Sequence, residues 1–226
     1  MLERVIGPIA LFAALAGQFG AAQTTPPDIP CRPQPDELRA FVLRTTKATS
    51  DATTVLQAMD DWAGIDTKGL VNPLLGFGVY QSAHVSITLY PPYFAYRFQV
   101  SEALRRSAPV DEIEVPKSVR ITVNPMTIDT TDIDDIERVI VERNRARVTP
   151  WTNGDFALKS FSTKLGPQVL RYAGNLEFSC SAFIPGGEVI VTVIPTRGAN
   201  KIRRLTPREL TLISGLPGEP AAGRSR

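Results

Sequence analysis

From residue 70 onward, apolar side chains recur at every second position in short runs that proline or glycine residues separate. The clearest runs cover residues 85–89, 119–123, 176–180 and 189–193. Successive side chains of a strand point to opposite faces, so each run predicts a strand with one buried face. The pattern predicts a mainly β protein built as an antiparallel β-sandwich, with a small β-barrel as the alternative.

An aromatic segment follows the Pro-Pro pair at positions 91–92, which we expect to turn the chain. Apolar residues at 94, 96, 98 and 100 alternate with their neighbours and predict another strand. Tyr90 and Tyr93 flank the turn on the other face, where they provide a partner-binding surface or pack the turn. The core residues predicted from the alternating runs are Phe94, Tyr96, Phe98, Ile121, Val139, Val141, Phe178, Val191 and Val193.

Residues 36–62 carry apolar side chains at spacings of three and four, which predicts one N-terminal amphipathic helix packed on the sheets. Pro35 and the acids at 36–37 suit its first turn, and Gly64 suits its end. Threonine and serine residues weaken its middle, so a strand at 38–46 followed by a helix at 51–62 is the alternative. A last strand is expected within 201–213.

Residues 1–22 have the order of a secretory signal peptide, with Arg4, an apolar stretch at 6–19 and small residues before Gln23. The stretch is too short, and too interrupted by glycine and proline, to span a bilayer. We expect cleavage near Gln23, a periplasmic or secreted protein, and no integral membrane segment in the mature chain.

The two cysteines, Cys31 and Cys180, are expected to form a disulfide in such an oxidising compartment. Two unpaired thiols, with Cys180 packed as a small apolar side chain, are the alternative. The expected organisation is a signal peptide at 1–22, an extended leader at 23–35, a single helix-plus-sandwich domain at 36–213 and a disordered tail at 214–226.

The formal net charge of +2 gives no reason to expect a nucleic acid or an anionic membrane as partner. One histidine and two cysteines do not make a normal zinc ligand set, so we expect neither a metal nor a cofactor.

His84 and the acids at 129–137 are the first polar residues to consider as chemical groups. His84 is the single imidazole and a possible general base, although a solvated histidine on a strand face explains it better. The acids at 129–137 resemble a calcium loop but lack the EF-hand glycine, and a polar turn explains them.

A charged hairpin is expected at 137–148, with its turn at Asn144-Arg145. Arg143, Arg145 and Arg147 on this hairpin are candidates for binding an anionic partner. Pairing with the glutamates of the same hairpin is the alternative interpretation.

These observations favour an exported, non-enzymatic binding protein of a bacterial-type cell envelope, whose partner is another envelope protein or a glycan. One alternative is a hydrolase that acts on envelope glycans through paired carboxylates. The other is a small carrier of an apolar ligand, held behind residues 70–79.

Overall fold

The computed structural model describes residues 31–65, 76–82, 84–125, 136–151, 154–162 and 168–215. The predicted signal peptide, most of the leader, the acids at 129–135 and the tail from 216 lie outside the described residues, as does most of segment 70–79. Within the described residues the fold is mixed, with 33% helix and 36% strand. The prediction of a mainly β protein is therefore wrong, because helices are nearly as abundant as strands.

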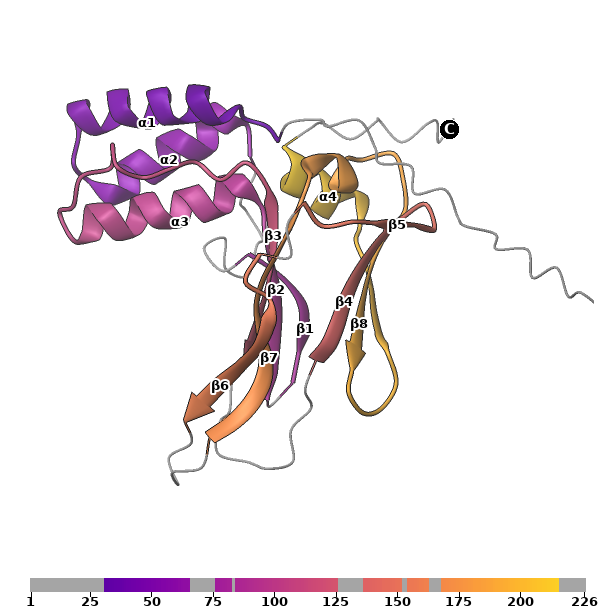
Figure 1. Cartoon of the computed structure of the whole chain (residues 1–226). Coiled ribbons are helices and arrows are strands. Elements are labelled where there is room, and N and C mark those ends of the chain that lie inside the picture. The colour runs from indigo at the N-terminus through magenta and orange to yellow at the C-terminus, as the bar shows by residue number, and fades with distance from the viewer. Residues whose placement is uncertain are drawn as a thin grey trace, which may run out of the picture.

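The nine described strands form two antiparallel sheets (Figure 1). The five-stranded sheet has the order β1 (Phe77–Gln81), β2 (Val85–Tyr90), β3 (Val119–Pro125), β7 (Gln168–Phe178), β6 (Ala157–Ser162). The four-stranded sheet has the order β5 (Ala146–Val148), β4 (Ile136–Arg143), β8 (Val189–Pro195), β9 (Lys201–Arg204). These strands do not close into a barrel, so the barrel alternative is wrong.

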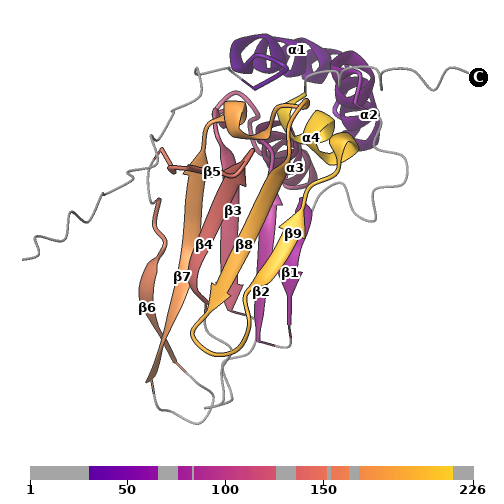
Figure 2. The same cartoon turned by 90° about the vertical axis from the view of Figure 1, so that its right-hand side faces the viewer.

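The two sheets pack across one hydrophobic cluster. Ile121 on β3, Val141 on β4 and Val191 on β8 are fully buried in this cluster. Viewed face-on, β4, β8 and β9 lie in front of the five-stranded sheet (Figure 2). The alternating valines and isoleucines therefore point inward, as the sequence predicts, and the residues between them point outward.

The N-terminal segment forms two helices, α1 (Pro35–Ala48) and α2 (Ala52–Ala63), rather than one. Asp51 caps α2, because its carboxylate accepts a hydrogen bond of 2.7 Å from the backbone N–H of Thr54. Gly64 ends α2 with a φ of 64°, as the sequence predicts. The break at 49–51 thus comes from a helix cap, and the alternative strand at 38–46 is also wrong.

Residues Pro92–Arg105 form a helix, α3, and the strand predicted over 93–100 is wrong. Pro91 is its N-cap and Pro92 occupies its first turn, where the missing N–H of proline costs nothing. Phe94 and Tyr96 are buried as predicted, but the side chain of Phe98 is 41% exposed. Phe98 is therefore not a core residue, although the other eight predicted core residues are buried.

Helices α1, α2 and α3 pack on one another in a second cluster beyond one end of the five-stranded sheet (Figure 1). A buried ion pair joins two of them, since Arg97 of α3 donates bonds of 2.8 Å to both carboxylate oxygens of Asp60 on α2. The Tyr93 hydroxyl donates a third bond, of 2.7 Å, to Asp60.

The end of the described chain forms β9 and then α4 (Pro207–Ser214), so the last strand predicted within 201–213 is correct only in its first part. Thr206 and Glu209 form a capping box at the start of α4. Leu210 and Ile213 pack between the sheets, whereas Leu212 packs with the three other helices. Ser214 belongs to this helix and not to a tail.

The predicted disulfide is confirmed: Cys31 is bonded to Cys180 in η1 (Cys180–Phe183), with a Cα–Cα distance of 5.2 Å. Next to it, the backbone N–H of Arg32 donates a 2.9 Å hydrogen bond to the carbonyl of Ser214. None of the helices in the described part of the chain has the length and apolar character needed to cross a membrane.

Candidate functional site

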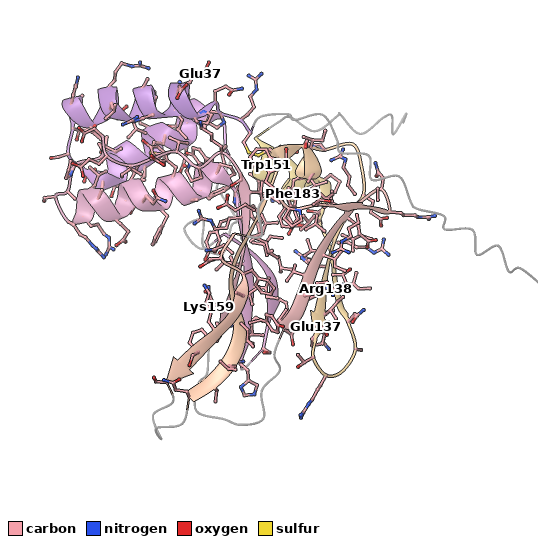
Figure 3. All side chains as sticks on the ribbon, viewed as in Figure 1. Glu37, Glu137, Arg138, Trp151, Lys159 and Phe183 are labelled. Atoms are coloured by element: carbon pink, nitrogen blue, oxygen red, sulfur yellow. A yellow bond between two sulfur atoms is a disulfide. The ribbon has the colours of Figure 1, made fainter. Side chains whose placement is uncertain are left out.

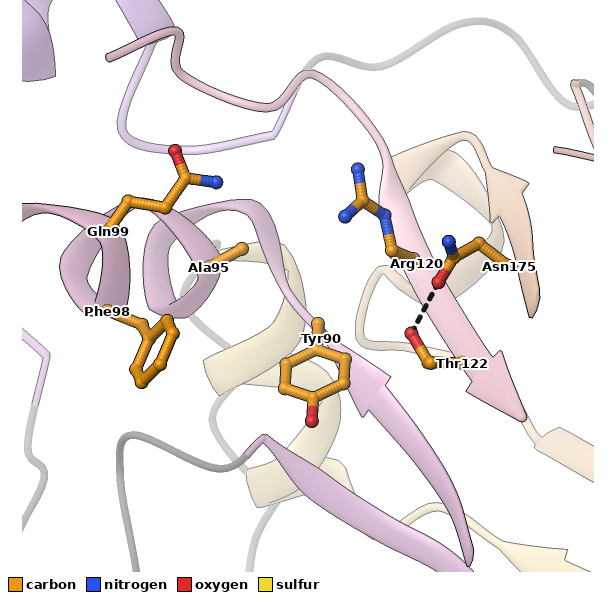
Figure 4. A pocket seen from close by; sticks show the side chains of 7 residues that line it. All are labelled: Tyr90, Ala95, Phe98, Gln99, Arg120, Thr122 and Asn175. Carbon is orange, nitrogen blue, oxygen red and sulfur yellow. Dashed lines mark hydrogen bonds between the residues drawn. The ribbon is translucent and has the colours of Figure 1, made fainter. Parts of the chain in front are cut away.

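A groove runs along α3 where this helix leaves the end of the five-stranded sheet. Its first hollow has a volume of about 370 Å³ and lies against the outer face of the sheet, turned away from the four-stranded sheet. Figure 4 shows its lining side chains, which come from β2, α3, β3 and β7: Tyr90, Ala95, Phe98, Gln99, Arg120, Thr122 and Asn175.

Two further hollows, of about 590 and 490 Å³, share Gln99 with the first. The second follows α3 and the segment after it, and is lined by Phe98, Gln99, Glu102, Ala103, Arg106, Ala108, Pro109, Glu112, Ile113 and Glu114. The third lies beside the start of β3, and is lined by Gln99, Glu114, Val115, Pro116, Lys117, Ser118, Arg120, Trp151 and Glu177. We call the three together the α3 groove.

Two large aromatic side chains of the groove are exposed. Phe98 is 41% exposed and Trp151 is 48% exposed, although burial of such rings is strongly favourable. Trp151 lies at the end of the sheets that is nearest to the helices (Figure 3). Its backbone N–H donates a 2.8 Å hydrogen bond to the carbonyl of Glu177, which anchors its main chain to β7. Together with half-buried Tyr90, these rings give the groove three aromatic surfaces.

Polar side chains on β3, on β7 and just before β3 form the floor of the first and third hollows. Thr122 donates a 2.7 Å hydrogen bond to the Asn175 amide oxygen. An ion pair of 3.4 Å joins Arg120 to Glu177, and the Ser118 hydroxyl donates a 3.0 Å bond to the same carboxylate. The Arg120 Nε–H has no acceptor among the described residues. This Nε–H is itself buried, so the floor is ordered mainly by the hydrogen bonds among its own side chains.

The two tyrosines predicted to bind a partner have different positions. Tyr90 ends β2 and lines the groove, whereas Tyr93 is only 3% exposed and lies inside the helical cluster. Burial and the hydrogen bond to Asp60 raise the pKa of Tyr93. The expectation of an exposed ring at position 93 is therefore wrong.

The three candidate arginines lie on the predicted hairpin, which has its turn at Asn144 and Arg145, both at positive φ. Arg143 points inward and donates hydrogen bonds to the carbonyls of Ser181, Ala182 and Ile184. Burial lowers its pKa, and its role here is to satisfy carbonyls at the end of η1. Arg145 and Arg147 are exposed and do not line the groove.

His84 precedes β2, is half-buried and lines none of the three hollows. Its backbone carbonyl accepts a 3.1 Å hydrogen bond from Arg171. Among the described residues no group of three or more histidine, cysteine, aspartate or glutamate side chains is placed to hold a metal ion.

The sequence reasoning missed Phe98, Gln99 and Trp151. A signal for the first two was available, because 95, 98, 99 and 102 follow a helical spacing and share one face of α3. The sequence contains no comparable signal for Trp151, because the position of this residue depends on the hydrogen bond between its loop and β7.

Comparisons of the chain with protein-family models, with curated proteins and with solved structures find no significant match. The function must therefore be inferred from the site itself.

Proposed function

We propose that the protein is an exported, non-enzymatic binding protein of the cell envelope that holds a chain-like ligand in the α3 groove. The observation that carries this proposal is the exposure of Phe98 and Trp151 in hollows that adjoin one another at Gln99. Exposed aromatic rings on an ordered framework are typical anchors of binding surfaces.

The Cys31–Cys180 bond supports export, since disulfides persist in oxidising compartments outside the cytoplasm. The finer proposal, a periplasmic or secreted location, is supported by this bond together with the predicted signal peptide.

A hydrolase remains the second candidate, because Glu114 and Glu177 line the same hollow. Against it, Glu177 already accepts bonds from Ser118 and Arg120, which favour a structural role. Changing Glu114→Gln separates the two functions: a hydrolase loses turnover altogether, whereas a binding protein, which has no turnover, still sediments with envelopes.

The proposal is tested by co-sedimentation of the purified protein with envelopes isolated from the producing cells. We expect the native protein to sediment with them and the variants Phe98→Ala and Trp151→Ala to stay largely in solution. Ile202→Ala is the matched control, because this exposed apolar residue lies on β9 outside the groove. Equal sedimentation of all four proteins, or of none, would refute the proposal.

A further inference from the structure

We infer that the ligand of the α3 groove is an uncharged oligosaccharide chain; this inference rests on the proposed function. It follows from the kinds of side chain in the groove, from the balance of its charges, and from the hydrogen bonds that the neighbouring main chain already makes.

The side chains match the two surfaces of a sugar ring. A pyranose has an apolar C–H face, which packs on an aromatic ring, and hydroxyl groups at its edge, which need planar donors and acceptors. In Figure 4 the rings of Phe98 and Tyr90 lie on one side of the first hollow, with Gln99 and Arg120 on the other. A sugar ring in this hollow would thus have aromatic rings on one side and polar side chains on the other.

The charges of the groove do not favour a polyanion. Its lining contains four glutamates and three basic residues: Glu102, Glu112, Glu114, Glu177, Arg106, Lys117 and Arg120. Arg120 is paired with Glu177, and Arg106 with Glu102. A groove so nearly balanced gives no long-range attraction for a strongly charged chain.

The main chain beside the groove is not available for an added peptide strand. A peptide that extends a sheet needs unpaired N–H and C=O groups at a strand edge. On β7, the Asn175 N–H donates to the Asp155 carboxylate and the Glu177 carbonyl accepts from Trp151. β3 is paired with β2 and β7 on its two sides. Recognition in the groove must therefore use side chains, which suits a glycan better than an extended peptide.

The ligand class is tested by titration calorimetry with neutral hexasaccharides: chitohexaose, cellohexaose, mannohexaose and the neutral glycans released from envelopes of the producing cells. We expect one of them to bind, with an affinity that changes less than about twofold between low and high salt. Phe98→Ala and Trp151→Ala should each weaken it at least about tenfold, and Ile202→Ala should not. Binding should change the tryptophan fluorescence of the native protein, but not that of Trp151→Ala.

Binding of a hexasaccharide that both groove variants retain would overturn the inference, because the glycan would then lie elsewhere. If no neutral glycan binds and protease treatment of the envelopes abolishes groove-dependent sedimentation, the ligand is a protein; the inference fails and the proposed function stands. If sedimentation with envelopes does not depend on Phe98 and Trp151 either, both fail. Unchanged thermal midpoints of the variants exclude misfolding as the cause.

Discussion

The buried carboxylate of Asp60 should be among the most sensitive positions of this fold. Its side chain accepts three hydrogen bonds, of 2.7, 2.8 and 2.8 Å, from Tyr93 and Arg97. Asp60 and Arg97 are 5% and 9% exposed. Asp60→Ala leaves the guanidinium buried without its counter-charge, which costs about 3–5 kcal/mol in the free energy of unfolding.

Partial changes at the same site should cost less. Tyr93→Phe removes one bond to a charged acceptor and should lower the free energy of unfolding by about 1.5–3 kcal/mol. The double change Asp60→Leu with Arg97→Met removes both charges and should recover most of the loss of Asp60→Ala. Asp61→Ala is the control, since its exposed side chain accepts a hydrogen bond from Gln57 and its loss should stay within about 0.5 kcal/mol.

Urea unfolding, followed by circular dichroism and by tryptophan fluorescence, measures these differences. The reasoning is refuted if Asp60→Ala costs less than about 1 kcal/mol. It is also refuted if the double variant loses as much free energy of unfolding as the single variants Asp60→Leu and Arg97→Met lose together.

Further predictions concern stability. Replacing Cys31 and Cys180 together by serine should lower the free energy of unfolding by about 5 kcal/mol, because the bond closes a loop of 149 residues; an unchanged urea midpoint would contradict this. Phe94→Ala should cost about 3–5 kcal/mol, whereas exposed Phe98→Ala should cost less than about 1 kcal/mol, and equal losses in urea unfolding would contradict the helical assignment of α3. Hydrogen bonds from the side chain and backbone of Thr54 lower the pKa of Asp51, so its contribution is present above the unfolded pKa of about 3.9 and lost as pH falls through the lower folded pKa. The stability of the native protein relative to Asp51→Asn, which keeps the cap, should therefore decline below about pH 4 and be constant above about pH 6; a constant difference over the whole range would contradict it.

The strands were predictable from the sequence where one face is buried and the other is not. Val119, Ile121 and Val123 alternate with polar residues, and only a strand places all three in one core. The disulfide was predictable too, because a sequence expected to be exported has two cysteines, which leave a single possible pair.

The helix α3 was not predicted, because its segment satisfies two periods at once. Positions 94, 96, 98 and 100 alternate, yet 93, 96, 97 and 100 follow the helical spacing that the fold uses. The helix places the charge of Arg97 against buried Asp60, a partner 37 residues away. Patterns of local hydrophobicity do not contain that pairing, so they leave the choice between strand and helix open, although the helical spacing of the groove residues 95, 98, 99 and 102 is present in the sequence.

The helix α3 carries Arg97 and Phe98 as consecutive residues, so their side chains leave its axis about 100° apart. Asp60 holds the first inside the molecule, and the second stands in the groove. The ion pair with Asp60 therefore fixes the rotation of α3 about its own axis, and this rotation sets the position of Phe98 in the groove. A ligand bound to the Phe98 ring and the Asp60 carboxylate bound to the Arg97 guanidinium both restrain the rotation of α3. Ligand binding and the ion pair should therefore strengthen each other, because such coupling is reciprocal. Occupation of the groove should slow hydrogen exchange at the Arg97 guanidinium, about 100° around the helix from Phe98.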